Sequence, residues 1–184
     1  MGAPCFRFKQ FTVWHDRCAM KVGTDGVLLG AWCGLPRVNG ECVHVLDIGT
    51  GSGLIALMLA QRLEKETQCF AIRGIDIEPS AVEQSRINFE ASPWASHLSA
   101  NNCSLQELVD DGGYDLIVSN PPYFQNSLKN PDRSRATARH TDTLTYTELL
   151  AHSKRLLKSD GTLSLILPLE AETEILELAK TNKL

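Results

Sequence analysis

The stretch VHVLDIGTGSG at residues 43–53 decides the fold, and LIALMLAQRL follows it at residues 54–63. Its first six residues are mostly apolar, which predicts a strand buried on both faces. Three alternating glycines then predict a tight turn whose backbone can approach a ligand closely. The apolar run that follows predicts a helix over about 54–63. Residues 43–63 are therefore expected to form a strand, a turn and a helix.

The same alternation continues toward the C-terminus. Strands are expected at 70–75, near Leu98, at 114–119 and, after a turn at Asp160-Gly161, as a buried strand at 163–167. Helices are expected to begin at Pro79-Ser80 and to span 145–157 and 170–180. Apolar strands that alternate with helices predict an α/β fold with a doubly wound, mostly parallel, Rossmann-like sheet. Ligands of such folds bind at the carboxyl ends of the strands.

The first 36 residues differ from this regular pattern. Phe6, Phe8, Phe11 and Val13 alternate irregularly with polar residues, which predicts one or two short strands. A short helix is expected over 22–32, with Thr24 or Asp25 as its cap and Gly34 and Pro36 ending it. We therefore expect a short β/α extension before the main sheet.

The composition indicates a single domain. The chain has 184 residues, 43% of them hydrophobic, which suffices for a core without disulfides or metals. The cysteines are scattered without a C-x-x-C pair, so we expect buried thiols of a reducing compartment. They are Cys5, Cys18, Cys33, Cys42, Cys69 and Cys103.

The sequence contains neither a targeting signal nor a metal-binding motif. The N-terminus lacks the apolar run of a signal peptide, and no stretch approaches 18 apolar residues, so we expect a cytoplasmic protein without membrane contact. His15 and His140 stand outside any metal-ligand spacing, so no metal is expected.

The glycine turn indicates the kind of ligand. Its spacing is G-x-G-x-G after Asp47, unlike the G-x-G-x-x-G of dinucleotide folds, and no Lys-Ser/Thr of a P-loop is nearby. Asp47 would repel a pyrophosphate but attract the cationic methionine end of S-adenosylmethionine. Asp76 follows Gly53 by 23 positions, where an acidic residue accepts hydrogen bonds from ribose hydroxyls, with Glu78 as a nearby substitute. The sequence therefore predicts an S-adenosylmethionine site.

A second motif, Asn120-Pro121-Pro122-Tyr123, directly follows the apolar strand at 114–119. Two prolines end the strand and stiffen the backbone. A planar NH2 nitrogen is a poor nucleophile, and the carbonyl groups of Asn120 and Pro121 can hold its hydrogens. Tyr123 offers an aromatic face to a flipped base. We predict methyl transfer to a planar NH2 group, with these four residues as the catalytic motif.

Two basic runs bear on the substrate, although the chain as a whole has a formal charge of -4. Such a charge argues against a generally basic nucleic-acid binder but leaves room for local patches. Each run has a local charge of +3, one within 1–21 and one within 125–140 beside the second motif. Either run is also compatible with an ordinary solvated surface. The predicted RNA-binding residues are Arg7, Lys9, Lys129, Arg133, Arg135 and Arg139.

Both motifs resemble those of class I S-adenosylmethionine-dependent methyltransferases. The blocks at 8–11, 15–26, 57–62 and 92–94 are similar to those of the bacterial tRNA1(Val) (adenine(37)-N6)-methyltransferase family. This resemblance implies methylation of the adenosine beside the anticodon of a valine tRNA. It also implies two regions, an extension at 1–36 that packs on the cofactor site and a methyltransferase domain at 37–184. The implied cofactor-binding residues are Lys21, Gly23, Thr24, Asp47, Gly49, Gly51, Gly53, Asp76, Ile77, Ser104 and Asn120.

Two departures from the family accompany the resemblance. Ser104 stands where the family usually has an acidic residue that contacts the adenine amino group of the cofactor. Relatives also continue through two further strands, so we expect a sheet without them and a more exposed fifth strand.

Two other functions stay open at this point, as does the oligomeric state. A protein glutamine N5-methyltransferase acts on a similar NH2 group, and the chain resembles such enzymes at the same four-residue motif. A non-catalytic cofactor-binding or RNA-binding module is the second alternative.

Overall fold

The computed structural model describes residues 4–109, 113–121 and 144–184. Its main sheet consists of β3 (Val43–Ile48), β4 (Phe70–Asp76), β5 (Leu98–Asn102), β6 (Tyr114–Ser119) and β7 (Leu157–Leu165). The helices are α1 (Thr24–Trp32), α2 (Leu54–Leu63), α3 (Pro79–Glu90), α5 (Tyr146–Leu156) and α6 (Glu172–Asn182). Among the described residues, short 3-10 helices also lie at Ala95–His97 and Leu169–Ala171.

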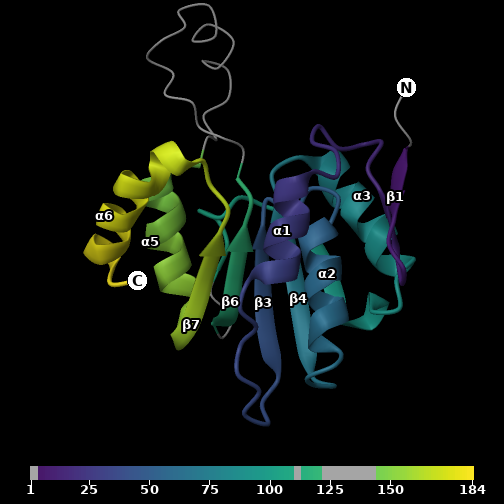
Figure 1. Cartoon of the computed structure of the whole chain (residues 1–184), viewed down its shortest axis with the longest axis horizontal. Helices are drawn as coiled ribbons and strands as arrows, with labels where there is room; N and C mark the ends of the chain where they lie inside the picture. Colours follow the sequence, from purple (N-terminus) through teal and green to yellow (C-terminus); the bar gives the residue numbers. More distant parts are fainter. Residues whose placement is uncertain (1–3, 110–112, 122–143) are drawn as a thin grey trace, which may run out of the picture.

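The sheet is parallel, in the order β5-β4-β3-β6-β7 (Figure 1). The chain first builds outward from β3 through β4 to β5, then crosses to the other side of β3 for β6 and β7. The order thus reverses at β3, and the crevice beyond the carboxyl ends of β3 and β6 is where such folds bind ligands. The predicted α/β, doubly wound sheet is confirmed.

Helices cover both faces of the sheet, as Figure 1 shows. On one face, Val45 and Leu116 pack with Leu57 of α2 and Phe89 of α3 in a buried cluster. On the other face, a second cluster places Leu46 and Ile117 against Leu149 and Leu156 of α5. Alternate residues of β3 therefore face opposite clusters, as the period of two along a strand requires.

The last strand and the first helix differ from the prediction. β7 begins at Leu157 and runs through Asp160 and Gly161, so the predicted turn there is wrong, and the strand is only partly buried. A Cβ on Gly161 would lie 2.7 Å from the Tyr114 carbonyl oxygen, so this glycine permits close approach at a register shift between β6 and β7. The residue that caps α1 is Gly23, because Thr24 already lies in the helix and no side chain caps it.

The N-terminal extension forms a hairpin of its own. β1 (Cys5–Arg7) and β2 (Thr12–Trp14) pair antiparallel and make a two-stranded sheet separate from the main one. The Phe8 and Phe11 rings stack 4.5 Å apart, and Phe11 meets Trp94 edge-on at 5.7 Å. These aromatic side chains therefore serve packing. In Figure 1 the hairpin lies beside α3, at one side of the sheet.

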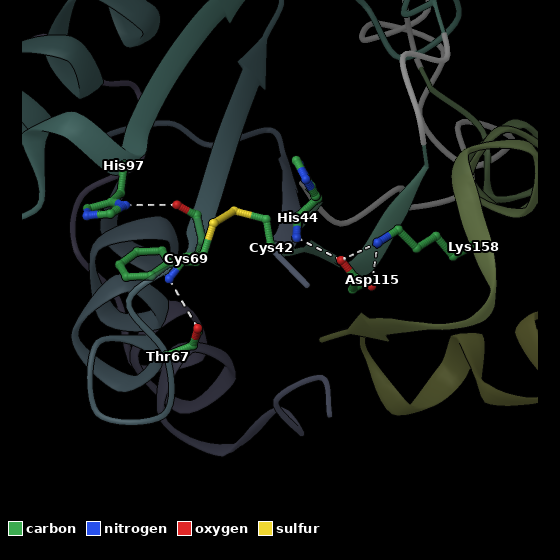
Figure 2. Close-up of a disulfide and its surroundings, with 8 residues drawn as sticks. Cys42, His44, Thr67, Cys69, His97, Asp115 and Lys158 are labelled. Atoms are coloured by element: carbon green, nitrogen blue, oxygen red, sulfur yellow. Dashed lines mark hydrogen bonds and ion pairs between the residues drawn. A yellow bond between two sulfur atoms is a disulfide. The ribbon is translucent and has the colours of Figure 1, made fainter. Parts of the chain in front are cut away.

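Cys42 and Cys69 form a disulfide, shown in Figure 2. The prediction of free thiols is wrong for this pair, because Val43 and Phe70 are partners in the parallel register and the residues before them lie side by side. The prediction that all the thiols are buried is also wrong in part. Of the four free cysteines, Cys18 and Cys33 are buried, whereas Cys5 and Cys103 are only half-buried.

Reduction of this disulfide should lower stability, because the bond closes a loop between residues 27 positions apart. We expect the free energy of unfolding to fall by about 2–4 kcal/mol when a reductant is added. Denaturant unfolding, followed by tryptophan fluorescence with and without reductant, measures the change. The double variant C42S/C69S should have the reduced stability under both conditions, whereas C103S should respond to reductant as the wild type does. Equal stability of the oxidised and reduced wild type would contradict the prediction.

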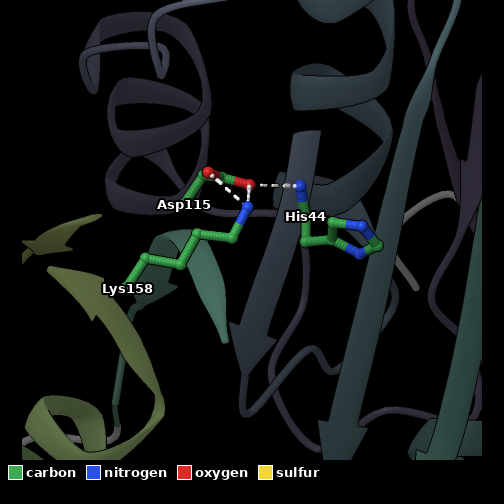
Figure 3. A network of polar contacts seen from close by, with 3 residues as sticks. All are labelled: His44, Asp115 and Lys158. Atoms are coloured by element: carbon green, nitrogen blue, oxygen red, sulfur yellow. Dashed lines mark hydrogen bonds and ion pairs between the residues drawn. The ribbon is translucent and has the colours of Figure 1, made fainter. Parts of the chain in front are cut away.

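An ionic network holds the amino ends of three strands, at the edge opposite the glycine turn (Figure 3). Lys158 Nζ on β7 lies 2.8 and 2.9 Å from the two carboxylate oxygens of Asp115 on β6. The same carboxylate accepts a hydrogen bond of 2.7 Å from the backbone N–H of His44 on β3.

Within the part of the chain that the structure describes, no helix is long and apolar enough to cross a bilayer.

Candidate functional site

The glycine turn, residues 49–53, lies directly beyond β3 and is tied to the end of β4. The backbone N–H groups of Gly49 and Thr50 both donate to the carbonyl of Ile75, at 2.9 and 3.0 Å. The Gly51 N–H donates to Asp76 Oδ2 at 2.9 Å. Three hydrogen bonds therefore link the backbone of the turn to the end of β4.

Gly53 is the glycine of the turn that is least replaceable by a residue with a side chain. Its φ is 79°, in the left-handed region that side chains other than hydrogen disfavour, and Gly49 and Gly51 have φ values of 69° and 54°. A Cβ on Gly53 would also overlap the ring of Phe89. Both the backbone conformation and the packing against α3 therefore require glycine here.

Asp47, the acid before the turn, is fully buried rather than open to solvent. Its Oδ2 accepts a hydrogen bond of 2.8 Å from the Thr50 hydroxyl, and its Oδ1 has no hydrogen-bond partner among the described residues. Burial raises the pKa of this carboxyl to about 7, although Thr50 and the backbone of Ala56 at the start of α2 oppose the rise. One of the two Asp47 carboxylate oxygens thus lacks a well-aligned hydrogen-bond donor beneath the turn.

Stability should depend on pH through Asp47. Its pKa is about 7 in the folded protein and 3.8 as the reference value, so the folded state holds this proton more tightly. The resulting stabilisation is complete below about pH 4 and declines as pH rises to 7, on the order of 1.4 kcal/mol per unit of pKa difference. Chemical denaturation from pH 4 to 8 should show a smaller decline in Asp47→Asn, whose side chain does not ionise. Parallel curves for the two proteins would contradict the assignment.

Asp76, predicted to bind ribose hydroxyls, lies at the carboxyl end of β4 and is half-buried. Its two carboxylate oxygens already accept the N–H groups of Gly51 and Glu78, at 2.9 and 3.0 Å. Carboxylate oxygens have further lone pairs, so a ligand can share them. The next residue, Ile77, is about half exposed and offers an apolar surface beside this carboxylate.

Asn102 is a residue that the sequence prediction missed. Its side-chain NH2 donates to the carbonyls of Asp76 and Ile77, both at 2.9 Å. Because Asn102 ends β5 opposite Asp76 in the register, it fixes the backbone that presents the Asp76 carboxylate and the Ile77 side chain. A polar residue after an expected strand was its only sequence signal.

Ser104, one of the implied cofactor residues, has a carboxylate beside it. Its hydroxyl donates to Glu107 Oε2 at 2.9 Å, and its backbone N–H donates to the same oxygen at 3.3 Å. The family's acidic residue is therefore absent from position 104, but an exposed carboxylate from three residues later lies next to that position.

Asn120 and Pro121 lie directly beyond β6, beside the glycine turn. Ile48 pairs with Ser119 in the register, and the buried Ser119 hydroxyl donates to the Ile48 carbonyl at 2.9 Å. Ser119 thus joins the residue before Asn120 to the residue before the turn, a role that the sequence prediction missed. Asn120 is half-buried and Pro121 is buried, whereas Pro122 and Tyr123 lie outside the described residues.

The start of α1 completes this part of the site. A Cβ placed on Gly26 would lie 3.9 Å from Asn120 Nδ2 and 3.0 Å from Leu54 of α2. The small residue therefore lets α1 approach both Asn120 and the first turn of α2. Arg62 of α2 holds the other end of α1, because its guanidinium donates to the carbonyls of Gly30 and Cys33 at 2.9 and 2.7 Å.

The implied cofactor-binding residues Lys21, Gly23 and Thr24, at and before the start of α1, are exposed. Gly23 precedes the helix and Thr24 begins it. The Lys21 ammonium donates to the carbonyls of His15 and Cys18, at 2.8 and 3.2 Å, and so braces its own segment. Part of its hydrogen-bonding capacity is therefore already used by the protein.

The predicted RNA-binding residues are placed only in part. Arg7 on β1 and Lys9 in the hairpin turn are exposed. The remaining four lie outside the described residues and are Lys129, Arg133, Arg135 and Arg139. Among the described side chains, no group of three or more His, Cys, Asp or Glu residues is arranged to hold a metal ion.

A glycine turn and an Asn-Pro motif that meet at the switch point of a parallel sheet define the class as a methyltransferase domain. The family model of the methyltransferase small domain matches residues 35–179. This match covers the five strands of the main sheet and both motifs.

The curated relatives narrow the class. A tRNA1(Val) (adenine(37)-N6)-methyltransferase of Parabacteroides distasonis is 50% identical over 186 residues, which cover 100% of this chain and 75% of the relative. A protein of the same name from Phocaeicola vulgatus is 48% identical, covering 97% of this chain and 73% of that one. The chain belongs to the tRNA1(Val) (adenine(37)-N6)-methyltransferase family.

Solved structures agree with the fold. A ribosomal protein L11 methylase from Lactobacillus delbrueckii subsp. bulgaricus superposes with a TM-score of 0.56 at 20% identity. The superposition covers 86% of this chain and 66% of that structure. At this identity the likeness concerns the fold alone.

Proposed function

We propose that this protein transfers a methyl group from S-adenosylmethionine to N6 of adenine 37 in tRNA1(Val). The observation that carries the proposal is the pairing of Ile48 with Ser119, which brings the glycine turn and Asn120 to the same edge of the sheet. The names of relatives about half identical to the whole chain supply the substrate. A tRNA substrate would place the reaction in the cytoplasm.

The residues at this edge fit S-adenosylmethionine. Asp47 has a buried oxygen without a hydrogen-bond donor, which suits a ligand whose methionine end is cationic. Asp76 presents a half-buried carboxylate for ribose hydroxyls, and Ile77 presents an apolar surface for a planar base. Bound there, the cofactor supplies a methyl group on a positively charged sulfur.

Asn120 and Pro121 would act on the amine that receives the methyl group. Their carbonyl oxygens would accept the two amino hydrogens and favour a pyramidal nitrogen, whose lone pair is then available to receive the methyl group that the cofactor would supply. The nitrogen afterwards loses a proton to solvent, so no strong base is required. Positioning by these two residues supplies most of the rate enhancement.

Exposed basic residues of the hairpin would bind the tRNA backbone. Arg7 and Lys9 are exposed on the hairpin, where phosphate contacts do not compete with packing.

The Glu107 carboxylate, held beside Ser104, would accept a hydrogen bond from the adenine amino group of the cofactor in place of the usual acidic residue. The hairpin and α1 thus form the extension that we place against the cofactor site.

A labelling experiment tests the proposal. The protein is incubated with S-adenosylmethionine that carries a radiolabelled methyl group and with either unmodified tRNA or a protein extract. We expect the label in N6-methyladenosine after digestion of the tRNA. Label in protein alone would support a glutamine methyltransferase instead, and no label in either substrate would favour a non-catalytic module.

A further inference from the structure

We infer that Asn88 on α3 is a positioning residue that couples the N-terminal hairpin to the glycine turn. The inference rests on the proposed function, because it concerns the turn that would hold S-adenosylmethionine. Asn88 lies outside both sequence motifs, and its sequence context gives no sign of such a role.

Asn88 joins three backbone groups from two distant segments. Its Oδ1 accepts the N–H of Trp14 at 2.9 Å, and its Nδ2 donates to the Trp14 carbonyl at 2.7 Å. The same Nδ2 donates at 2.7 Å to the carbonyl of Ser52, between Gly51 and Gly53. The side chain is only 1% exposed, so water cannot replace these bonds.

The orientation of the amide is determined by its partners. Two carbonyls need the NH2 end and one N–H needs the oxygen end, so a flipped amide would oppose like groups at all three positions. One planar group therefore determines the separation between Trp14 and Ser52.

The glycine turn depends on this contact. Asp76 holds the Gly51 N–H from one side, and the Phe89 ring packs against Gly53 from α3. The Ser52 carbonyl lies between these two anchors, and Asn88 precedes Phe89 on the same helix. A movement of Asn88 is therefore transmitted to the segment of the turn that approaches the cofactor.

The hairpin depends on it as well. An isolated two-stranded hairpin is at best marginally stable, and β1 and β2 pair only with each other in the described sheets. The hairpin is attached to α3 through Asn88. The segment after the hairpin is attached to α3 at Arg17, whose backbone N–H donates to Gln84 Oε1 at 3.2 Å and whose side chain forms an exposed ion pair with Glu83. Of these contacts, the one at Asn88 also reaches the glycine turn.

Coupling through one residue has a reciprocal consequence. A ligand that orders the turn also orders the hairpin, which presents Arg7 and Lys9, and an RNA that orders the hairpin favours the turn conformation that binds cofactor. Cofactor and RNA should therefore strengthen each other's binding.

Cofactor affinity tests the inference without any need for catalysis. Titration calorimetry of the full chain with S-adenosylmethionine should show about 10-fold weaker binding for Asn88→Ala and for the isosteric N88D, which replaces the donor by an oxygen. Gln84→Ala is the matched control, because it removes a contact to Arg17 after the hairpin but keeps the bonds that join Trp14, Asn88 and Ser52, so its affinity should stay within about threefold of the wild type. Affinity of both Asn88 variants within that range overturns the inference.

Two further measurements separate coupling from simple loss of structure. Val13 is fully buried in β2, so Val13→Ala perturbs the hairpin. This change should weaken cofactor binding in the wild type and have no effect in the Asn88→Ala background. In the unmodified protein, cofactor should slow hydrogen exchange at the Trp14 amide, a result that needs no variant to fold. Unchanged exchange overturns the coupling.

The outcomes distinguish this inference from the proposed function. A wild type that methylates tRNA but has normal affinity in the Asn88 variants retains the function and loses the inference. A wild type that binds cofactor with the expected Asn88 dependence but leaves tRNA unlabelled supports the coupling and loses the tRNA substrate. A wild type that binds no cofactor overturns both.

Discussion

Replacement of Asn120 by alanine should slow methyl transfer strongly and weaken cofactor binding far less. The substitution removes one of the two acceptors that would hold the amino group, and loss of a single group of this kind costs about 100-fold to 1000-fold in rate. Asn120 is half-buried beyond the end of β6, so its truncation leaves the core intact. Single-turnover transfer to tRNA and calorimetric titration with S-adenosylmethionine measure the two properties separately.

Asn39→Ala is the control for this variant. Asn39 is exposed and lies before the amino end of β3, whereas Asn120 follows the carboxyl end of the parallel strand β6. Its replacement should alter neither rate nor affinity. Turnover of Asn120→Ala at the wild-type rate would remove Asn120 from the chemistry and with it the main reason to place the reaction at the end of β6.

Gly53→Ala should destabilise the protein and weaken cofactor binding together. The backbone φ of 79° costs about 1–2 kcal/mol for a residue with a Cβ, and overpacking against Phe89 adds about 1–3 kcal/mol. A loss of this size would remove a large part of the stability of a domain this small. Urea unfolding gives the change in free energy, and calorimetry on the folded fraction gives the change in affinity.

Two variants separate the causes. The double variant G53A/F89A removes the ring that the new Cβ would meet, so it isolates the cost of the backbone conformation from the cost of the overlap. Gly34→Ala introduces the same methyl group where no heavy atom lies within 4 Å, and it should change stability by less than about 1 kcal/mol. If Gly53→Ala proved as stable as Gly34→Ala, the turn could not have the geometry described here.

Several elements could be predicted because their signals are local. The strand at 43–48, the helix at 54–63 and the strand at 114–119 were predicted with the observed bounds. Each combines a mostly apolar run with a glycine or proline motif directly beside it, and both signals are local in the sequence. The two functional motifs were found for the same reason, since each is a short contiguous sequence.

Other features depend on segments that are far apart in the chain. The turn predicted at Asp160-Gly161 is a strand because Gly161 packs closely against Tyr114 of the neighbouring strand. The Cys42–Cys69 disulfide follows from the parallel register of β3 and β4, and the roles of Ser119, Asn102 and Asn88 follow from partners at least 25 positions away.

The sequence by itself therefore determined the class of fold, the order of its elements and the two motifs that meet at the site. The tertiary structure alone decided how the site is supported: that Asp47 is buried beneath the turn, that Asp76 holds Gly51, and that Asn88 joins the turn to the hairpin. The physical reason is the separation along the sequence over which each effect acts. Periodicity and turn chemistry act between near neighbours in the chain, whereas burial and side-chain hydrogen bonds form only when distant segments pack together.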